Sequence, residues 1–107
     1  MYFVNSRKFY KMMIQQKQEG SKGSFYVEES GILLAKMTYS MTGNSLMIID
    51  HTEVSDELRG KNVGYQLVKA AVEHARTNDI KIIPLCPFAN SVFKKKSSEF
   101  GDVLRPN

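Results

Sequence analysis

The hydrophobic pattern of this 107-residue chain changes from the period of strands to that of a helix at Val63. Before that residue, the segments 24–29, 32–40 and 45–54 have the character of strands and are separated by "SG" and "TGN", the spacing of tight hairpins. From Val63 onward, apolar residues recur at helical spacing instead. Consecutive hairpins followed by an amphipathic helix predict an α+β domain, in which a mostly antiparallel sheet is covered by a helix.

The two periods also predict which residues form the core. In the segment 32–40 the better apolar face consists of Leu33, Ala35, Met37 and Tyr39. In the helix the apolar stripe consists of Leu67, Val68, Ala71, Val72 and Ala75, and the outward positions are Gln66, Lys69, Glu73 and Arg76. The stripe is wide enough for one helix to cover the sheet.

The rest of the chain supplies smaller elements. Residues 14–18 fit a first strand, and residues 78–86 fit a turn followed by a short strand. Residues 88–100 fit a second main helix, whose apolar members are Phe88, Val92 and Phe93. We therefore expect a single domain over residues 14–107, preceded by an N-terminal arm over residues 1–13 that has no clear period.

Composition limits the classes of protein to which the chain can belong. No apolar run approaches the roughly 20 residues of a membrane-spanning helix, and the N-terminus lacks the pattern of a secretory signal. We therefore expect a cytoplasmic protein without a membrane partner. Cys86 is the only cysteine, so it cannot form an internal disulfide and would remain a thiol in a reducing compartment. We further expect a monomer or weak dimer. A net charge of +4 and a pI near 9.2 indicate an anionic partner, which charge alone does not identify.

The segment "RGKNVG", residues 59–64, leads directly into the helix. The first amides of a helix have no intrahelical partner and carry a partial positive charge, so a bare turn ahead of them can hold a phosphate. Gly60 and Gly64 let an anion approach without meeting a Cβ, and Asn62 tolerates the left-handed conformation. The spacing is neither that of a Walker loop nor that of a dinucleotide fingerprint. On these features alone, a phosphate loop and an ordinary loop entering a core helix remain equal alternatives.

The segment "EVSDELRGKNVGYQLVKAAVEHA" resembles the coenzyme A loop of the GCN5-related N-acetyltransferases, whose pattern is R/Q-x-x-G-x-G/A. The departure is Asn62, where the family usually has glycine. "IDHTEV" before the loop and "LCPF" after the next strand are similar to a subfamily of about one hundred residues, the size of one small domain, which shares a His-Thr strand and a later cysteine.

This resemblance implies a compact fold in which the sheet splays apart between the strand before the loop and the strand after the helix. Acetyl-CoA would enter that gap as cosubstrate, with Val54 beside the pantetheine arm and Asn90 bonded to the pantetheine amide. The pyrophosphate would be bound along the loop by Arg59, Gly60, Lys61, Asn62, Val63 and Gly64. One lysine of the run 94–96 could meet the 3′-phosphate, although such a run is more often a solvated helix face.

The resemblance also places His51 and Cys86 on the two walls near the thioester. An imidazole with a pKa near 6.5 can take a proton from an attacking amine directly, or it can activate Cys86 as a covalent acetyl carrier. The alternative interpretation is that His51 is a structural histidine and Cys86 is a small buried apolar residue. Glu53 and Asp50 are alternative bases, of which only Glu53 shares the side of His51. The second helix lacks the tyrosine that many family members use to protonate the leaving thiolate.

The leading hypothesis is thus an acetyl-CoA-binding N-acetyltransferase that acetylates an amine, on a small molecule or a protein lysine, and has no metal site. The alternative is a module that holds acyl-CoA without turnover, because so small a chain is expected to lack most of the N-terminal helices from which larger family members build an acceptor pocket. A nucleic-acid binder ranks last, since only net charge and scattered aromatic residues favour it.

Overall fold

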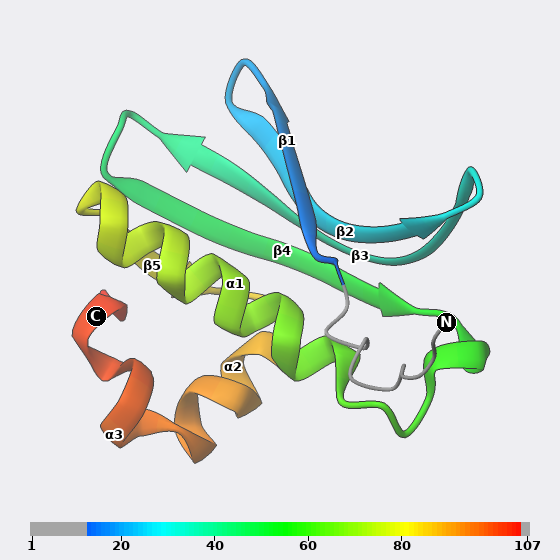
Figure 1. The fold of residues 1–107 in the computed structure, drawn as a ribbon. Helices are drawn as coiled ribbons and strands as arrows, with labels where there is room; N and C mark the ends of the chain where they lie inside the picture. Colours follow the sequence, from blue (N-terminus) through cyan, green and yellow to red (C-terminus); the bar gives the residue numbers. More distant parts are fainter. Residues whose placement is uncertain (1–12, 106–107) are drawn as a thin grey trace.

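The computed structural model describes residues 13–105 and contains one five-stranded sheet with its helices packed on one face (Figure 1). The strands follow sequence order across the sheet: β1 (Gln15–Glu19), β2 (Lys22–Glu29), β3 (Ile32–Thr42), β4 (Leu46–Val54) and β5 (Lys81–Pro84). Strands β1 to β4 pair antiparallel with one another, and β5 is parallel to β4. The helices are α1 (Val63–Asn78), α2 (Pro87–Lys95) and α3 (Ser97–Phe100). Of the N-terminal arm expected over residues 1–13, all but the exposed Met13 lies outside the described residues.

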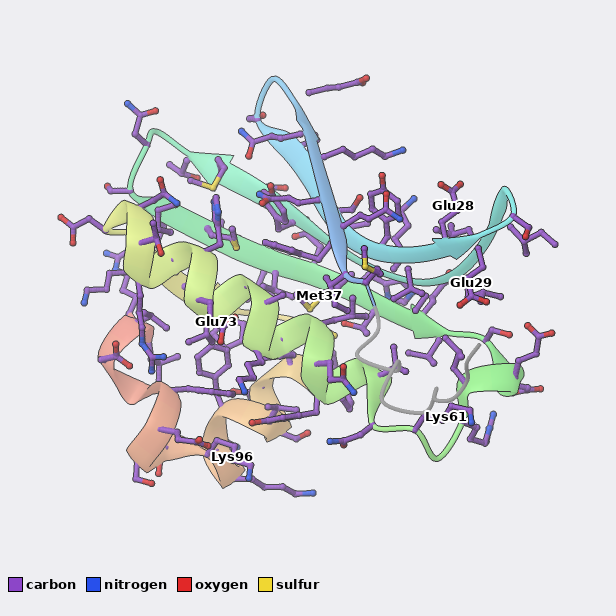
Figure 2. The ribbon with its side chains drawn as sticks, in the orientation of Figure 1. Glu28, Glu29, Met37, Lys61, Glu73 and Lys96 are labelled. Atoms are coloured by element: carbon purple, nitrogen blue, oxygen red, sulfur yellow. The ribbon has the colours of Figure 1, made fainter. Side chains whose placement is uncertain are left out.

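The hairpins predicted from the sequence are confirmed, and most of the predicted core face of β3 is buried. Ala35, Met37 and Tyr39 are at most 3% exposed, and Met37 lies between the sheet and α1 (Figure 2). Leu33 was wrongly assigned to this face, since it is 50% exposed. Val27 pairs with Ala35, but Glu28 pairs with Leu33, so β3 has one extra residue there. That bulge turns Leu33 to the other side of the sheet.

Helix α1 forms the second layer and packs on β2, β3, β4 and β5. Its predicted stripe is confirmed, because the side chains of Leu67, Val68, Ala71, Val72 and Ala75 are fully buried. Each fully buried Leu or Val contributes roughly 1.5–3 kcal/mol, so this contact fixes the helix firmly against the sheet. The position of the helix N-terminus, and of the loop before it, follows from that packing.

The second predicted helix is divided in two. Helix α2 ends at Lys95, Lys96 adopts φ −111° and ψ 32°, and a single further turn, α3, follows. Val92 and Phe93 are buried as expected, whereas Phe88 is 41% exposed and the expectation that it joins the core is wrong. Phe88 lies against the first turn of α1 instead, and there its ring covers Gly64.

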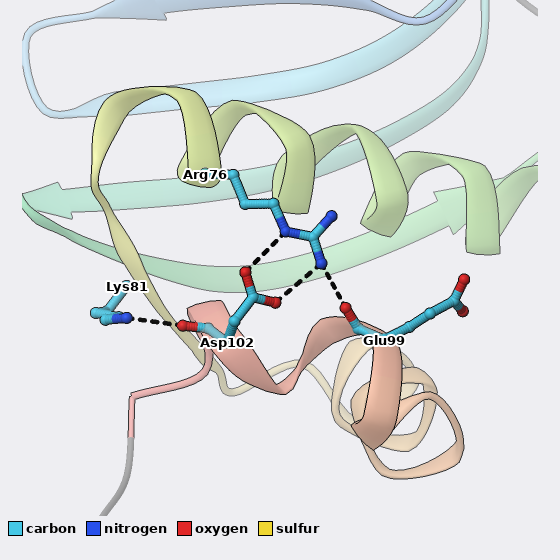
Figure 3. Close-up of polar contacts among 4 residues, drawn as sticks. All are labelled: Arg76, Lys81, Glu99 and Asp102. Carbon is cyan, nitrogen blue, oxygen red and sulfur yellow. Dashed lines mark hydrogen bonds and ion pairs between the residues drawn. The ribbon is translucent and has the colours of Figure 1, made fainter.

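The C-terminal segment is tied to α1 and β5 by polar contacts (Figure 3). The guanidinium of Arg76 donates to both carboxylate oxygens of Asp102, at 2.8 and 2.9 Å, and also to the carbonyl of Glu99. Lys81 Nζ donates to the carbonyl of Asp102 at 2.7 Å. The hydrogen bond from Arg76 holds the pKa of Asp102 below its ordinary value of 3.8. Within residues 13–105, no helix has the length and apolarity needed to cross a membrane.

Candidate functional site

The sheet opens between β4 and β5, as the family resemblance implies. The two strands pair only from Leu46 opposite Lys81 to Ile49 opposite Pro84. The carbonyl of Ile49 then accepts from the amides of both Leu85 and Cys86, at 3.1 and 3.0 Å, and the chain turns away into α2. Beyond this point no other strand of the described region covers the free edge of β4 at residues 52–54.

A cleft of about 620 Å³ occupies this opening and has the volume of a ligand pocket, which is roughly 300–1,000 Å³. It is lined by residues from β4, the loop, α1, α2 and the junction of α2 with α3, namely Thr52, Val54, Leu58, Arg59, Gly60, Asn62, Val63, Gly64, Tyr65, Phe88, Ser91, Val92, Lys95 and Lys96. Its walls are largely apolar, and no acidic side chain is among these lining residues of the described chain. The cleft therefore suits a long ligand with an apolar or amide-bearing arm and negative charge.

The loop before α1 has the backbone conformation that its sequence favours. Asn62 is left-handed, with φ 62° and ψ 27°, and Gly60 has φ +83°. The predicted tolerance of Asn62 for this conformation is confirmed, because asparagine is among the few residues other than glycine that adopt it readily. The two turns bend the chain from the short 3-10 helix Asp56–Leu58 into α1, so that Gly60, Asn62, Val63 and Gly64 line the cleft.

The N-terminus of α1 lacks the usual means of satisfying these amides. Asn62 occupies the N-cap position but makes no cap hydrogen bond with its side chain, and the first turn contains no acidic residue. The first amide that donates back along the helix is that of Gln66, to the carbonyl of Asn62 at 3.2 Å. Within residues 13–105 the amides of Val63, Gly64 and Tyr65 have no such acceptor. Among the residues that the structure describes, these three donors therefore have no backbone acceptor, at the positive end of the helix dipole.

Gly64 leaves the space that the Phe88 ring of α2 occupies over α1. A Cβ at this position would lie 2.6 Å from Cζ of Phe88, well inside van der Waals contact. The glycine thus lets the Phe88 ring lie directly over the first turn of α1, where it forms one wall of the cleft.

Positive charge reaches the cleft from two directions. Arg59 lies on the loop, where its guanidinium is 2.5 Å from the carboxylate of Asp56 and both side chains are exposed. Lys95 and Lys96 lie at the other end, and Lys96 Nζ is 5.4 Å from the ring centroid of Tyr65. Lys61, on the same loop as Arg59 (Figure 2), does not line the cleft.

The two residues predicted to be catalytic contact different side chains. His51 is exposed, and its Nε2 lies 3.2 Å from Oε2 of Glu53, which shares its side of β4 as expected. Cys86 is buried at the N-cap of α2, and its Sγ lies 3.4 Å from Oγ1 of Thr52. Because successive strand residues face opposite sides, Thr52 and His51 point away from each other. The structure therefore brings Cys86 to Thr52 and His51 to Glu53.

Asp50 does not follow the regular alternation of strand residues, from which we predicted that it points away from the side of His51. The pairing of β3 with β4 shifts register between Thr38 and Tyr39, which leaves Asp50 as an extra residue in β4. Its carboxylate accepts from Ser40 Oγ at 3.0 Å, on the face where His51 pairs with Thr38. The expectation that Asp50 points away from the side of His51 is wrong, because a bulge reverses the alternation.

Of the residues expected to bind the cofactor, Val54, Arg59, Gly60, Asn62, Val63 and Gly64 line the cleft, and Lys61 and Asn90 do not. Sequence reasoning did not place Thr52, Tyr65, Phe88, Ser91 or Lys95 and Lys96 there specifically. Of these residues, the sequence indicated a role in binding only for the two lysines, as part of the basic run 94–96. Which lysines face the cleft depends on the rotation of α2 against α1, and that rotation is a tertiary property.

Residues 24–103 match the model of a family described as GCN5-related N-acetyl-transferase. A GCN5-like protein from Staphylococcus aureus, solved by NMR, is 43% identical, with a TM-score of 0.66 over 88% of this chain and 90% of that one. No curated protein matches the sequence.

More distant structures share the fold. The ribosomal-protein-alanine N-acetyltransferase of Brucella melitensis is 16% identical, with a TM-score of 0.61 over 73% of this chain and 62% of that one. AAC(6′)-Iy, in complex with the bisubstrate analogue CoA-S-monomethyl-acetylneamine, is 14% identical, with a TM-score of 0.51 over 83% of this chain and 68% of that one.

Proposed function

This chain belongs to the GCN5-related N-acetyltransferase family, and from that premise we propose that it binds acetyl-CoA in the cleft and transfers the acetyl group to an amine. The amine is on a small molecule or on a protein lysine. We place the protein in the cytoplasm, since the free thiol of Cys86 fits a reducing compartment.

One observation carries the proposal: the uncapped N-terminus of α1 opens into the cleft. Amides that have no backbone acceptor in the described part of the chain, together with the helix dipole, suit the diphosphate of CoA, and the bare backbone at Gly60 allows close approach. Gly60, Asn62, Val63 and Gly64 would bind the diphosphate, with Arg59 and Lys61 adding charge from the loop. Arg59 can leave its exposed ion pair with Asp56 and bind the phosphate instead. The loss of free energy is small, because such exposed pairs contribute only about 0–1 kcal/mol.

The pantetheine arm would run along the free edge of β4. Since Ser55 donates its amide to Leu34 on the β3 side, the alternating amide of Val54 points to the opposite edge, towards the cleft. That amide can bind the arm or polarise the thioester carbonyl, and we assign Asn90 on α2 to the pantetheine amide.

We assign His51 as the general base of direct transfer. The amine nitrogen attacks the thioester carbon, the C–S bond breaks, and CoA leaves as the thiolate, while His51 takes the amine proton directly or through a water. When Glu53 accepts from Nε2–H of His51, the Nδ1 lone pair is the one available for that proton. The amide product, the CoA thiolate and the imidazolium account for every atom and charge.

The covalent route, in which Cys86 attacks the thioester first, has less support. Among the described residues the polar partner of the Cys86 side chain is the hydroxyl of Thr52, which does not remove a proton at neutral pH. The residue Cys86 is also only 4% exposed. We therefore assign Cys86 to packing beside the thioester and not to acetyl transfer.

A non-catalytic acyl-CoA-binding module is the second candidate, and the exposure of His51 favours it. Its side chain is 66% exposed, and an exposed base is poorly positioned for an acceptor. An assay of CoA thiol release from acetyl-CoA, with mass analysis of a panel of amines and lysine peptides, separates the two. Acetylated acceptor formed in proportion to released thiol supports the enzyme; saturable binding of acetyl-CoA with no released thiol on any acceptor supports the module.

A further inference from the structure

The base proposed for acetyl transfer lies on the face of the sheet that is turned away from the helices. Met37 of β3 packs towards α1, so the next residue, Thr38, points to the opposite face. His51 is paired with Thr38, Thr38 with Ser24, and Ser24 with Lys17. Because directly opposite residues of antiparallel strands share a face, these four side chains form a row that runs from β4 to β1, with His51 at one end.

Two further cavities connect the cleft to this row through shared lining residues. Val54 lines the cleft and also a cavity of about 450 Å³ at the ends of β3 and β4, which Lys36 lines as well. Lys36 in turn lines a cavity of about 520 Å³, together with Lys17, Ser24 and Thr38 of the row. An acceptor whose nitrogen lies at His51 can therefore extend its other end over Thr38 and Ser24.

A buried hydroxyl without a partner lines the larger of these two cavities. Ser24 is 4% exposed, and its Oγ takes part in no hydrogen bond with any residue that the structure describes. Buried hydroxyl groups usually have a partner, because an unsatisfied one destabilises the folded state. The Ser24 hydroxyl is therefore available to a ligand in the cavity.

The charged residues of the same cavity leave one lysine without a counter-charge. They are Lys17, Glu19, Lys22, Lys36 and Asp50. Lys22 Nζ donates to Ser40 Oγ at 3.0 Å, and Ser40 donates to Asp50 at 3.0 Å, so a hydroxyl joins this lysine to this carboxylate. Lys36 is half-buried and forms no ion pair with a described residue. An anion in the cavity thus finds an ammonium group and a buried hydroxyl.

We propose that the acceptor is a small amine whose other end carries an anionic group, a carboxylate or a phosphate, which Lys36 and the Ser24 hydroxyl bind. The inference rests on the proposed function and names its substrate class. From His51 to Ser24 the row crosses two strand spacings, about 10 Å, so a chain of several bonds separates the nitrogen from the anionic group. A lysine and a hydroxyl both donate to such a group, and hydrogen bonds between charged partners are the stronger kind.

The test compares four amines of equal chain length as acceptors from acetyl-CoA at low ionic strength. They are 6-aminohexanoate, 6-aminohexyl phosphate, hexylamine and 1,6-diaminohexane. We expect kcat/KM for at least one anionic amine to exceed that for hexylamine by about tenfold, and this ratio to fall with added salt. The second ammonium group of 1,6-diaminohexane should make it the poorest acceptor. The carboxylate and the phosphate are distinguished by which of the two anionic amines has the higher kcat/KM.

Variants assign the preference to residues. Lys36→Gln should lower the ratio to about one, and Lys36→Arg, which keeps the charge, should retain it. Ser24→Ala should also lower the ratio while the free energy of unfolding is retained, because the hydroxyl that it removes has no partner among the described residues. Lys69→Gln is the matched control, since Lys69 is exposed on α1 and lines neither cavity, and it should keep the wild-type ratio.

Binding can be measured apart from turnover. Saturable shifts of the backbone amides of Ser24 and Thr38 are expected with 6-aminohexanoate or 6-aminohexyl phosphate, and none of comparable size with hexylamine. Absence of these shifts with both anionic amines would contradict the site.

Other outcomes separate the inference from the proposed function. If hexylamine or 1,6-diaminohexane is acetylated at least as well as both anionic amines, the assigned substrate class is wrong and the proposed function stands. A preference that survives in Lys36→Gln, or that is lost equally in Lys69→Gln, removes the assignment to Lys36. If no amine of any kind releases thiol from acetyl-CoA, the proposed function fails together with the inference.

Discussion

The hydroxyl of Thr52 lies 3.4 Å from the sulfur of Cys86 and joins β4 to the start of α2 just beyond the point where β4 and β5 separate. The two walls of the cleft therefore stay in contact at this end and diverge towards the loop. Whatever enters the cleft meets Thr52 and Val54 on one wall and Phe88 and Val92 on the other. Predictions about binding and chemistry follow from this geometry.

Substitution of Gly64 should weaken acetyl-CoA binding without unfolding the protein. The new Cβ of Gly64→Ala meets the end of the half-exposed Phe88 ring, which can swing, so we expect about a tenfold loss of affinity, or 1.4 kcal/mol. The unfolding free energy should change by less than about 1 kcal/mol, because alanine is the better helix former. Calorimetry and urea unfolding measure the two effects.

The control for this prediction is a second substitution at the contact. Phe88→Ala in the Gly64→Ala background removes the clash and should recover much of the affinity. Gly101→Ala, where a Cβ meets open space, should leave binding unchanged. A Gly64→Ala protein that binds like wild type would show that the Phe88 ring does not shape the ligand site.

The left-handed backbone at Asn62 gives a prediction about stability. Asn62→Gly should retain or slightly raise the free energy of unfolding, whereas Asn62→Val should lower it by about 1–2 kcal/mol, since a β-branched residue is strained at φ 62°. Chemical unfolding in urea measures both variants. Equal stability of the two would contradict the conformation described for this residue.

Direct transfer predicts different results for the two candidate catalytic residues. His51→Gln should lower the turnover rate by about 10²–10⁴-fold, the usual contribution of a general base, and should leave acetyl-CoA affinity unchanged. Cys86→Ala should retain turnover, and intact mass should show no acetyl adduct on the wild-type chain. An adduct that disappears in Cys86→Ala, together with loss of turnover in that variant, would favour the covalent route instead.

The ion pair between Arg76 and Asp102 predicts an acid-dependent part of the stability. The hydrogen bond from Arg76 lowers the pKa of Asp102 below 3.8, so the folded state holds the ionised carboxylate more strongly than the unfolded state does. This contribution is present above pH ~4 and is lost as the pH falls through the folded pKa. Asp102→Asn should therefore melt at a lower temperature than wild type at pH 6. As the pH falls below ~4, the melting temperature of the variant should decrease less than that of wild type. Glu57→Gln, another exposed carboxylate outside the pair, should follow the wild-type curve.

Most of the architecture could be read from periodicity, because the stripe of α1 and the alternation of β2 to β4 are local patterns set by one covered face. Leu33 and Asp50 could not be placed this way, since each lies at a register shift that reverses the alternation. The loop before α1 was also predictable, because its glycines and Asn62 specify backbone angles directly. Lys95, Lys96 and Phe88 were not, since their direction depends on how α2 is rotated against α1.

The most direct test is an acetyl-CoA titration followed by residue-resolved NMR of the backbone amides. We predict saturable shifts at Gly60, Asn62, Val63 and Gly64, with a further shift at Val54, and none of comparable size on β1 or on the hairpin between β2 and β3. Unshifted loop amides at a saturating concentration of acetyl-CoA would contradict the account.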